Sequence, residues 1–265
     1  MQFDVICGAM PTQPLSSIGA KVAPDNPLFD LVTEAYRVFA GSKPKSTEVC
    51  EQCCMDQGIA ARFFETPIDY LPLEYVREWF SAATVVGGVS QQVWSYLLPR
   101  ILEILAVGDE PSFVGLEVSL KRFPTGKSAN WTKPQWNVLD KFQRAYLAQA
   151  VAGAGDHLDD VICMFSLASW PLNSLLEQVE AQDDAALAER LWQDWCEWNP
   201  EFVGEIWLTP FWEKPERARL FEFYTSEALY RRMEALALSD ATDSALAVKA
   251  SAVVEVIEAN AEWVR

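Results

Sequence analysis

Apolar side chains recur along most of this chain at the three- and four-residue spacing of an α-helix. Between Asn26 and Gly41, for example, Leu28, Val32 and Ala35 share one helical face. Asn before Pro is typical of a helix start, and Gly is typical of a helix end. The alternating pattern of strands is almost absent. The pattern therefore predicts an all-α protein.

Turn residues divide this pattern into about ten to twelve helices of roughly 10–20 residues. We expect them at 26–41, 72–88, 90–107, 112–122, 132–151, 157–168, 171–181, 184–198, from about 215 or 226 to 238, and at 244–262, with a short helix through Ile59, Phe63 and Phe64 inside 48–65. Thr132 with Gln135 has the form of a capping box, Asp183 that of an N-cap, and Pro99 is expected to kink or split its helix.

The first residues differ from the rest of the chain. Residues 1–25 contain Pro and Gly with little periodicity and are interpreted as an extended arm, and 26–265 as a single helical domain. Short loops make sequential helices antiparallel neighbours. The expected architecture is an irregular multi-helix array, with a HEAT-like stack of helical hairpins as an equal alternative because helix pairs recur every 30–45 residues or so.

Composition narrows the class of protein. Half of the residues are hydrophobic and eleven are Trp, which excludes a disordered acidic polymer. The chain opens with Asp4 where a signal peptide would carry a basic residue, and it has no apolar run of about 18 residues. We therefore expect a cytoplasmic protein that does not span a membrane, with its six Cys mostly reduced.

Charge is strongly negative and unevenly spread. The net charge is −17, and residues 133–265 hold 23 acidic against 11 basic side chains. Residues 155–205 contain twelve acidic residues and a single basic one, Arg190. Such a chain repels nucleic acid and anionic membranes, whose phosphates are negative. A basic protein is the partner that this charge favours.

The acidic region is also rich in Trp, and both features meet in the helix expected at 184–198. Large aromatic side chains supply affinity at protein interfaces, and charge steers the encounter. The predicted partner-binding residues are Asp184, Glu189, Trp192, Asp194, Trp195, Glu197 and Trp198. The alternative is ordinary amphipathicity, in which Trp lies inside and carboxylates face water.

Cys50, Cys53 and Cys54 are the sharpest local cluster. Thiolates at this spacing bind Zn²⁺ when further ligands converge, but the chain has no second Cys-x-x-Cys. A redox dithiol and a purely structural role are the alternatives. We expect no cofactor, with zinc at Cys50, Cys53 and Cys54 as the alternative.

Motifs of common enzymes are incomplete in this chain. Residues 123–128 read FPTGKS, but Lys121 stands where a phosphate-binding loop needs its first Gly. His157 is the single His, and the sequence indicates no nucleophile to go with it. We therefore expect a protein that is not an enzyme.

Two segments resemble a family of bacterial hypothetical proteins. VCEQCC at 49–54 is similar to a Cys-rich CEHC-like element, and WSYLLPRILEIL at 94–105 to a following helix that reads roughly FRYFLPRILEL. DDVICMFSLAS at 159–169 continues the likeness over about the central half of the chain. The resemblance implies no activity. Gln52 stands where the family carries His, which weakens the zinc interpretation.

The leading functional prediction is an acidic protein-binding module. Its sharpest form is an inhibitor or immunity protein that covers the basic cleft of a toxin enzyme. A small zinc protein or metal-dependent enzyme, and a structural helical-repeat adaptor, are the alternatives.

Overall fold

The computed structural model describes residues 19, 21–51, 54–153, 155–197 and 204–261. Its α-helices are α1 (Phe29–Val38), α2 (Gln57–Arg62), α3 (Leu73–Ser81), α4 (Gln91–Ala106), α5 (Lys133–Val151), α6 (Leu158–Leu167), α7 (Leu172–Glu180), α8 (Asp184–Trp192), α9 (Lys214–Tyr224), α10 (Glu227–Leu238) and α11 (Ser244–Asn260). Short 3₁₀ helices lie at η1 (Ile68–Tyr70), η2 (Leu116–Val118) and η3 (Ser128–Asn130), and a π turn, η4 (Gln193–Glu197), follows α8. The described residues contain no strand, so the all-α prediction is confirmed.

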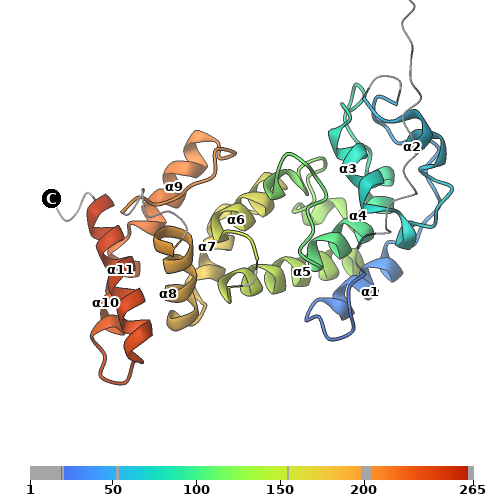
Figure 1. Cartoon of the computed structure of the whole chain (residues 1–265). Helices are drawn as coiled ribbons and strands as arrows, with labels where there is room; N and C mark the ends of the chain where they lie inside the picture. The colour runs from blue at the N-terminus through green and yellow to red at the C-terminus, as the bar shows by residue number, and fades with distance from the viewer. Residues whose placement is uncertain (1–18, 20, 52–53, 154, 198–203, 262–265) are drawn as a thin grey trace, which may run out of the picture.

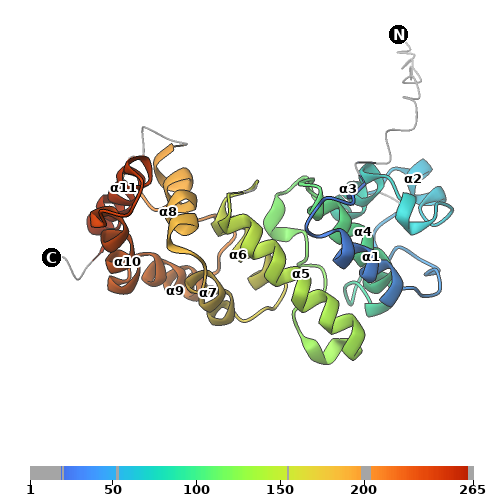
Figure 2. The same ribbon diagram turned by 90° about the horizontal axis from the view of Figure 1, so that it is seen from below.

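The helices form an elongated row (Figures 1 and 2). Helices α1 to α4 make one end, α5 and α6 the middle, and α8 to α11 the other end. Helix α5 connects the two ends, because it contacts α1 as well as α6, α7 and α8. Helix α11 packs between α10 and α8. The HEAT-like alternative is not shown by this arrangement.

Buried apolar side chains form one cluster that runs from Val22 to Ile257. Helix α4 lies deepest in it, with nearly every residue from Leu97 to Ala106 buried. Among the described residues, no helix is both long and apolar enough to cross a membrane.

Several helix starts agree with the capping signals in the sequence. The amide of Thr132 donates to Gln135 Oε1 over 3.1 Å in the predicted capping box. Asp183 Oδ1 accepts from the amides of Ala185 and Ala186 at the start of α8. These bonds satisfy amides that have no partner inside the helix.

Three local predictions need correction. The helix expected at 112–122 is wrong: only η2 forms there, because Gly115 has φ 142° just before it and breaks the helical path. Pro99 does not split its helix, since α4 is continuous on both sides of it. Helix α1 begins at Phe29, and Asn26 instead accepts the amide of Leu28 in a turn that leads into the helix.

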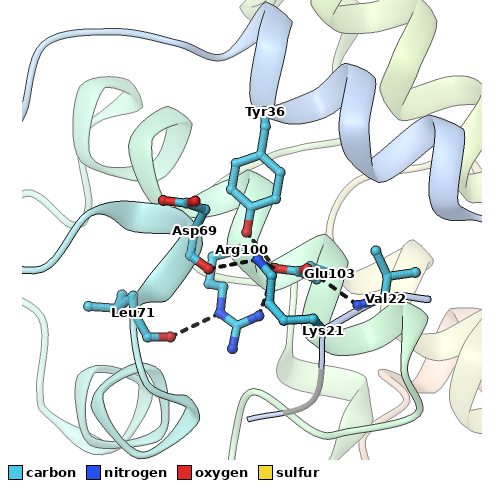
Figure 3. A network of polar contacts seen from close by, with 7 residues as sticks. All are labelled: Lys21, Val22, Tyr36, Asp69, Leu71, Arg100 and Glu103. Atoms are coloured by element: carbon cyan, nitrogen blue, oxygen red, sulfur yellow. Dashed lines mark hydrogen bonds and ion pairs between the residues drawn. The ribbon is translucent and has the colours of Figure 1, made fainter. Parts of the chain in front are cut away.

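A buried ion pair inside α4 holds the segment before α1 in place (Figure 3). Arg100 Nη1 lies 2.7 Å from Glu103 Oε2, and their side chains are 0% and 2% exposed. Glu103 also accepts from Tyr36 Oη at 2.7 Å and from Lys21 Nζ at 2.9 Å. Lys21 belongs to the arm predicted at 1–25, of which residues 1–18 and 20 lie outside the described part.

Opposing effects act on the Glu103 carboxyl. Burial by itself would raise its pKa, but hydrogen bonds from Tyr36 and Lys21 and the charge of Arg100 together lower it. The carboxylate is therefore ionised at neutral pH. Arg100 and Glu103 come from the segment PRILE at 99–103, so this short segment encodes a core ion pair.

Candidate functional site

Ionisable side chains from several parts of the chain lie close together at the start of α6. The segment Asp156 to Asp160 enters a helix whose residues Leu158, Val161, Ile162, Cys163, Met164 and Phe165 are all buried. Because α6 is covered on nearly all sides, its first-turn carboxylates cannot all point into water. Carboxylates are favoured at this end of a helix by its dipole.

Asp194 caps α6 from a distant part of the chain. It belongs to the π turn after α8, and its Oδ2 accepts from the amide of Leu158 at 3.1 Å and from Arg190 Nε at 3.0 Å. Its Oδ1 lies 2.9 Å from His157 Nδ1. The hydrogen bond and the charge of Asp194 raise the pKa of His157, although burial opposes them. His157 is thus a polar neighbour of Asp194.

Asp159 anchors the segment that precedes α9. Its side chain is 3% exposed and accepts from the amide of Thr209 at 2.5 Å and from Trp212 Nε1 at 3.0 Å. Burial raises the pKa of Asp159 to about 7, although these two donors act in the opposite direction. The Thr209 hydroxyl in turn donates to Glu117 in η2. Two carboxylates therefore hold this segment against the middle of the molecule.

Further carboxylates lie near one another beside this anchor, and we call Glu110, Glu117, Asp156 and Asp160 the α6 carboxylate cluster. Burial raises the pKa of Asp160 to about 7, with Glu117 and Asp156 adding to the effect. Burial and then Asp156 raise the pKa of Glu110. Burial also raises the pKa of Asp156. The Asp160 side chain makes no hydrogen bond or ion pair within the described ranges, although the charge of His157 opposes the rise in its pKa.

Exposed apolar side chains border the cluster. Trp207 is 50% exposed, and its ring centroid lies 6.4 Å from that of His157. Phe113 is also exposed, and its ring centroid lies 5.2 Å from the guanidinium carbon of Arg77, whose Nε donates to the backbone oxygen of Glu110. Exposed aromatic side chains next to charge are common at sites that bind another protein.

The predicted partner-binding carboxylates of α8 pair with basic side chains of the same chain. Asp184 pairs with Arg232 of α10, with Oδ1 2.8 Å from Nε. Glu189 pairs with Lys249 of α11, whose Nζ also lies 4.4 Å from the Trp192 ring centroid.

The remaining members of that set differ in exposure. Asp194 and Trp195 are buried, and the Trp195 ring packs edge-on against Tyr224. Glu197 is exposed, and Trp198 lies outside the described residues. A partner on this face would therefore meet Trp192 and Glu197, while the other described carboxylates are engaged within the chain.

The cysteine element lies on the end of the molecule formed by α2 and α3. The amide of Cys50 donates to Ala83 O at 2.8 Å, and Cys54 is exposed. Cys53 lies outside the described residues. No group of three His, Cys, Asp or Glu that could hold a metal ion occurs in the part of the chain that the structure describes. The zinc alternative at Cys50, Cys53 and Cys54 stays a prediction.

The loop that imitates a phosphate-binding sequence is packed in the core. Thr125 is buried and its hydroxyl accepts from Trp94 Nε1 at 2.9 Å. A Cβ on Gly126 would lie 2.4 Å from the amide nitrogen of Trp170. The described backbone of this loop packs directly on other protein atoms, which leaves no room there for a phosphate.

The carboxylate cluster is the part of the site that the sequence pattern did not single out. Asp156, Asp159 and Asp160 stand out only as part of a generally acidic stretch, and Glu110 and Glu117 carry no signal of their own. One signal was present: the apolar residues after Leu158 cover every face of the helix, so at least one first-turn carboxylate had to be buried.

Comparisons of this chain with models of protein families, with curated proteins and with solved structures found no match. The resemblance of 49–54 and 94–105 to a bacterial family therefore stays a prediction. Function has to be argued from the site alone.

Proposed function

We propose that this protein is a binding module for a basic protein partner, which docks over the α6 carboxylate cluster and the exposed side chains of Phe113 and Trp207. The observation that carries the proposal is the group of half-buried carboxylates Glu110, Asp156 and Asp160, whose pKa values are all raised. A net charge of −17 supports the same polarity for the partner.

The raised pKa values have a direct consequence for binding. The ionised forms of Glu110, Asp156 and Asp160 are destabilised by burial and by acidic neighbours, and the basic side chains nearby offset only part of this effect. A Lys or Arg side chain from a partner would reverse that destabilisation, and its charge would favour the ionised form. The cluster therefore favours a cationic guest over a neutral or anionic one.

The position of the proposed surface differs from the face of α8 that the sequence indicated. Asp184, Glu189 and Asp194 pair with basic side chains of the same chain, which removes much of their attraction for a partner. Asp160 has no such pair among the described residues. Charge that stays uncompensated attracts a partner more strongly than charge that is already paired.

The inhibitor or immunity protein is the sharpest form of this proposal. Such a protein needs a negative surface that reaches into a basic cleft and aromatic side chains that bury area at its edge. Trp207 and Phe113 beside the cluster support this form.

The test is fluorescence anisotropy with a labelled deca-lysine peptide at low and at physiological salt. We expect affinity to fall as salt rises, because screening shortens the reach of the charges. The double variant Glu110→Gln with Asp160→Asn should weaken binding about tenfold, at about 0.7 kcal/mol per charge.

The matched control is Asp240→Asn with Glu255→Gln, which removes the same net charge from exposed positions on and before α11. It should change affinity much less than the cluster variant does. Equal losses in the two variants, or binding that does not respond to salt, would contradict the proposed surface.

A further inference from the structure

A pocket of about 390 Å³ lies on the side of the molecule where the turn before α1, the end of α4, the end of α5 and the start of α6 meet. Its walls are Asn26, Pro27, Leu105, Ala106, Val107, Gly108, Tyr146, Gln149, Ala150, Gly155, Asp156 and Val161. Small-molecule sites in proteins begin at about 300 Å³. At roughly 30 Å³ per water, this volume fits a ligand of about a dozen non-hydrogen atoms.

The inner wall of the pocket is apolar. Leu105, Ala150 and Val161 are all buried and come from three different helices. They close the floor of the pocket but expose almost no surface of their own. The apolar surface that a ligand can cover comes mainly from Pro27 and Val107, and covering it is worth about 25 cal/mol for each Å² removed from water. An alkyl group fits this wall better than a strongly hydrated one.

The mouth of the pocket is open. Gly108 and Gly155 both line it with positive φ, 78° and 80°. A Cβ added at either glycine would meet no atom within 4 Å. Access from solvent therefore needs no movement of the described chain.

One wall of the pocket carries negative charge. Asp156 lies there, and the charges of Asp156 and Glu110 both add to the effect of burial in raising the pKa of Tyr146. Both carboxylates thus lie near the Tyr146 phenol. None of the described residues that line the pocket is Lys or Arg. His157 and Arg190 act on Asp156 from outside the pocket lining and lower its pKa, but burial outweighs them. An apolar floor beside a carboxylate is complementary to a cation with an alkyl stem.

We propose that this pocket binds an alkyl amine or alkyl guanidine, with the alkyl stem against Pro27 and Val107 over the floor described above and the cationic head at Asp156. The same chemistry has two sources, a free small amine and the side chain of Lys or Arg in a polypeptide. The inference does not rest on the proposed function, because a free amine can bind here even where no basic protein docks on the cluster.

The test is isothermal titration calorimetry of the intact protein with butylguanidine and with its neutral isostere butylurea. We expect saturable binding of butylguanidine and at least about tenfold weaker binding of butylurea, since a charge-assisted hydrogen bond is lost. Asp156→Asn should weaken butylguanidine about tenfold or more, whereas the control Asp240→Asn should leave it unchanged. Binding should also weaken as pH falls, because a proton then neutralises Asp156.

A second variant closes the pocket without removing charge. Ala150→Leu places a larger side chain on the inner wall and should abolish binding, while Asp156→Asn remains the test if that variant fails to fold. Equal binding of butylurea and butylguanidine, no loss in Asp156→Asn, or no saturable binding at millimolar concentration would overturn the proposal. A capped Gly-Arg-Gly peptide separates the sources: binding as tight as butylguanidine assigns a polypeptide side chain, and much weaker binding assigns a free small cation.

Discussion

Replacing Glu103 by Gln tests whether the ion pair inside α4 stabilises the end of the molecule where α1 and α4 meet. Arg100 is fully buried, and Glu103 accepts from Arg100, Tyr36 and Lys21 (Figure 3). Gln keeps one acceptor oxygen but removes the negative charge that lies 2.7 Å from Arg100 Nη1. Removing one member of a buried pair costs about 3–5 kcal/mol, and we expect the lower end because the amide still accepts a hydrogen bond.

The assay is urea and thermal unfolding of the wild-type protein and the variant, followed by circular dichroism. About 3 kcal/mol corresponds to a fall of roughly 6–12 °C in Tm for a chain of this size. The control is Asp140→Asn, which breaks an exposed pair with Arg144 whose N–O distance is 3.0 Å. That exposed pair is worth less than about 1 kcal/mol.

A double variant separates the charge from the packing. Replacing Arg100 by Met and Glu103 by Leu removes both charges together. It should cost less than Glu103→Gln, even though the bonds from Arg100 to Leu71 O and from Tyr36 to Glu103 are lost as well. If Glu103→Gln lowers stability no more than the exposed control does, the reasoning from burial is refuted. If the double variant is the more damaging one, packing and not charge dominates this part of the core.

Two further predictions concern pH and steric contact. The pKa of Asp159, about 7 in the folded protein, lies above the unfolded value, so the folded state binds the proton more tightly. The wild type should therefore lose stability relative to Asp159→Asn as pH rises from 5 to 8. The measurement is the difference in Tm between the two proteins at each pH, and a constant difference would contradict the prediction. Gly126→Ala should destabilise the protein by about 1–3 kcal/mol because its Cβ would meet the backbone of Trp170, whereas Gly41→Ala, with 3.7 Å to its nearest neighbour, should be close to neutral in urea unfolding.

The helices could be predicted from sequence where a local signal defined them. The capping box at Thr132 and the cap at Asp183 depend on residues two or three positions away, so the sequence contains the whole interaction. The segment 112–122 failed because its apolar spacing resembles a helix, whereas Gly115 adopts a φ that no helix contains. The spacing of apolar residues indicates which side chains are buried, but it does not determine the backbone angles of the segment that carries them.

The candidate site could not be predicted in the same way, because its contacts join residues that lie far apart in the sequence. Asp159 meets Thr209 and Trp212, which lie about fifty residues further along the chain. Asp194 caps α6 across 36 positions through the amide of Leu158. The pattern of acidic residues identifies neither pairing. Only the packing of α6 against its neighbours decides which carboxylates are buried.

The distribution of pairs changes what the negative charge of the chain means. On α8, Asp184 and Glu189 join that helix to α10 and α11 through Arg232 and Lys249, so this charge helps to hold the helices together. At the start of α6, Asp160 has no comparable pair among the described residues, and burial raises its pKa. A cation from a partner stabilises an ionised carboxylate that has no such pair much more than one that is already paired. The carboxylates that matter for a partner are therefore those that the fold leaves uncompensated, and net charge alone does not identify them.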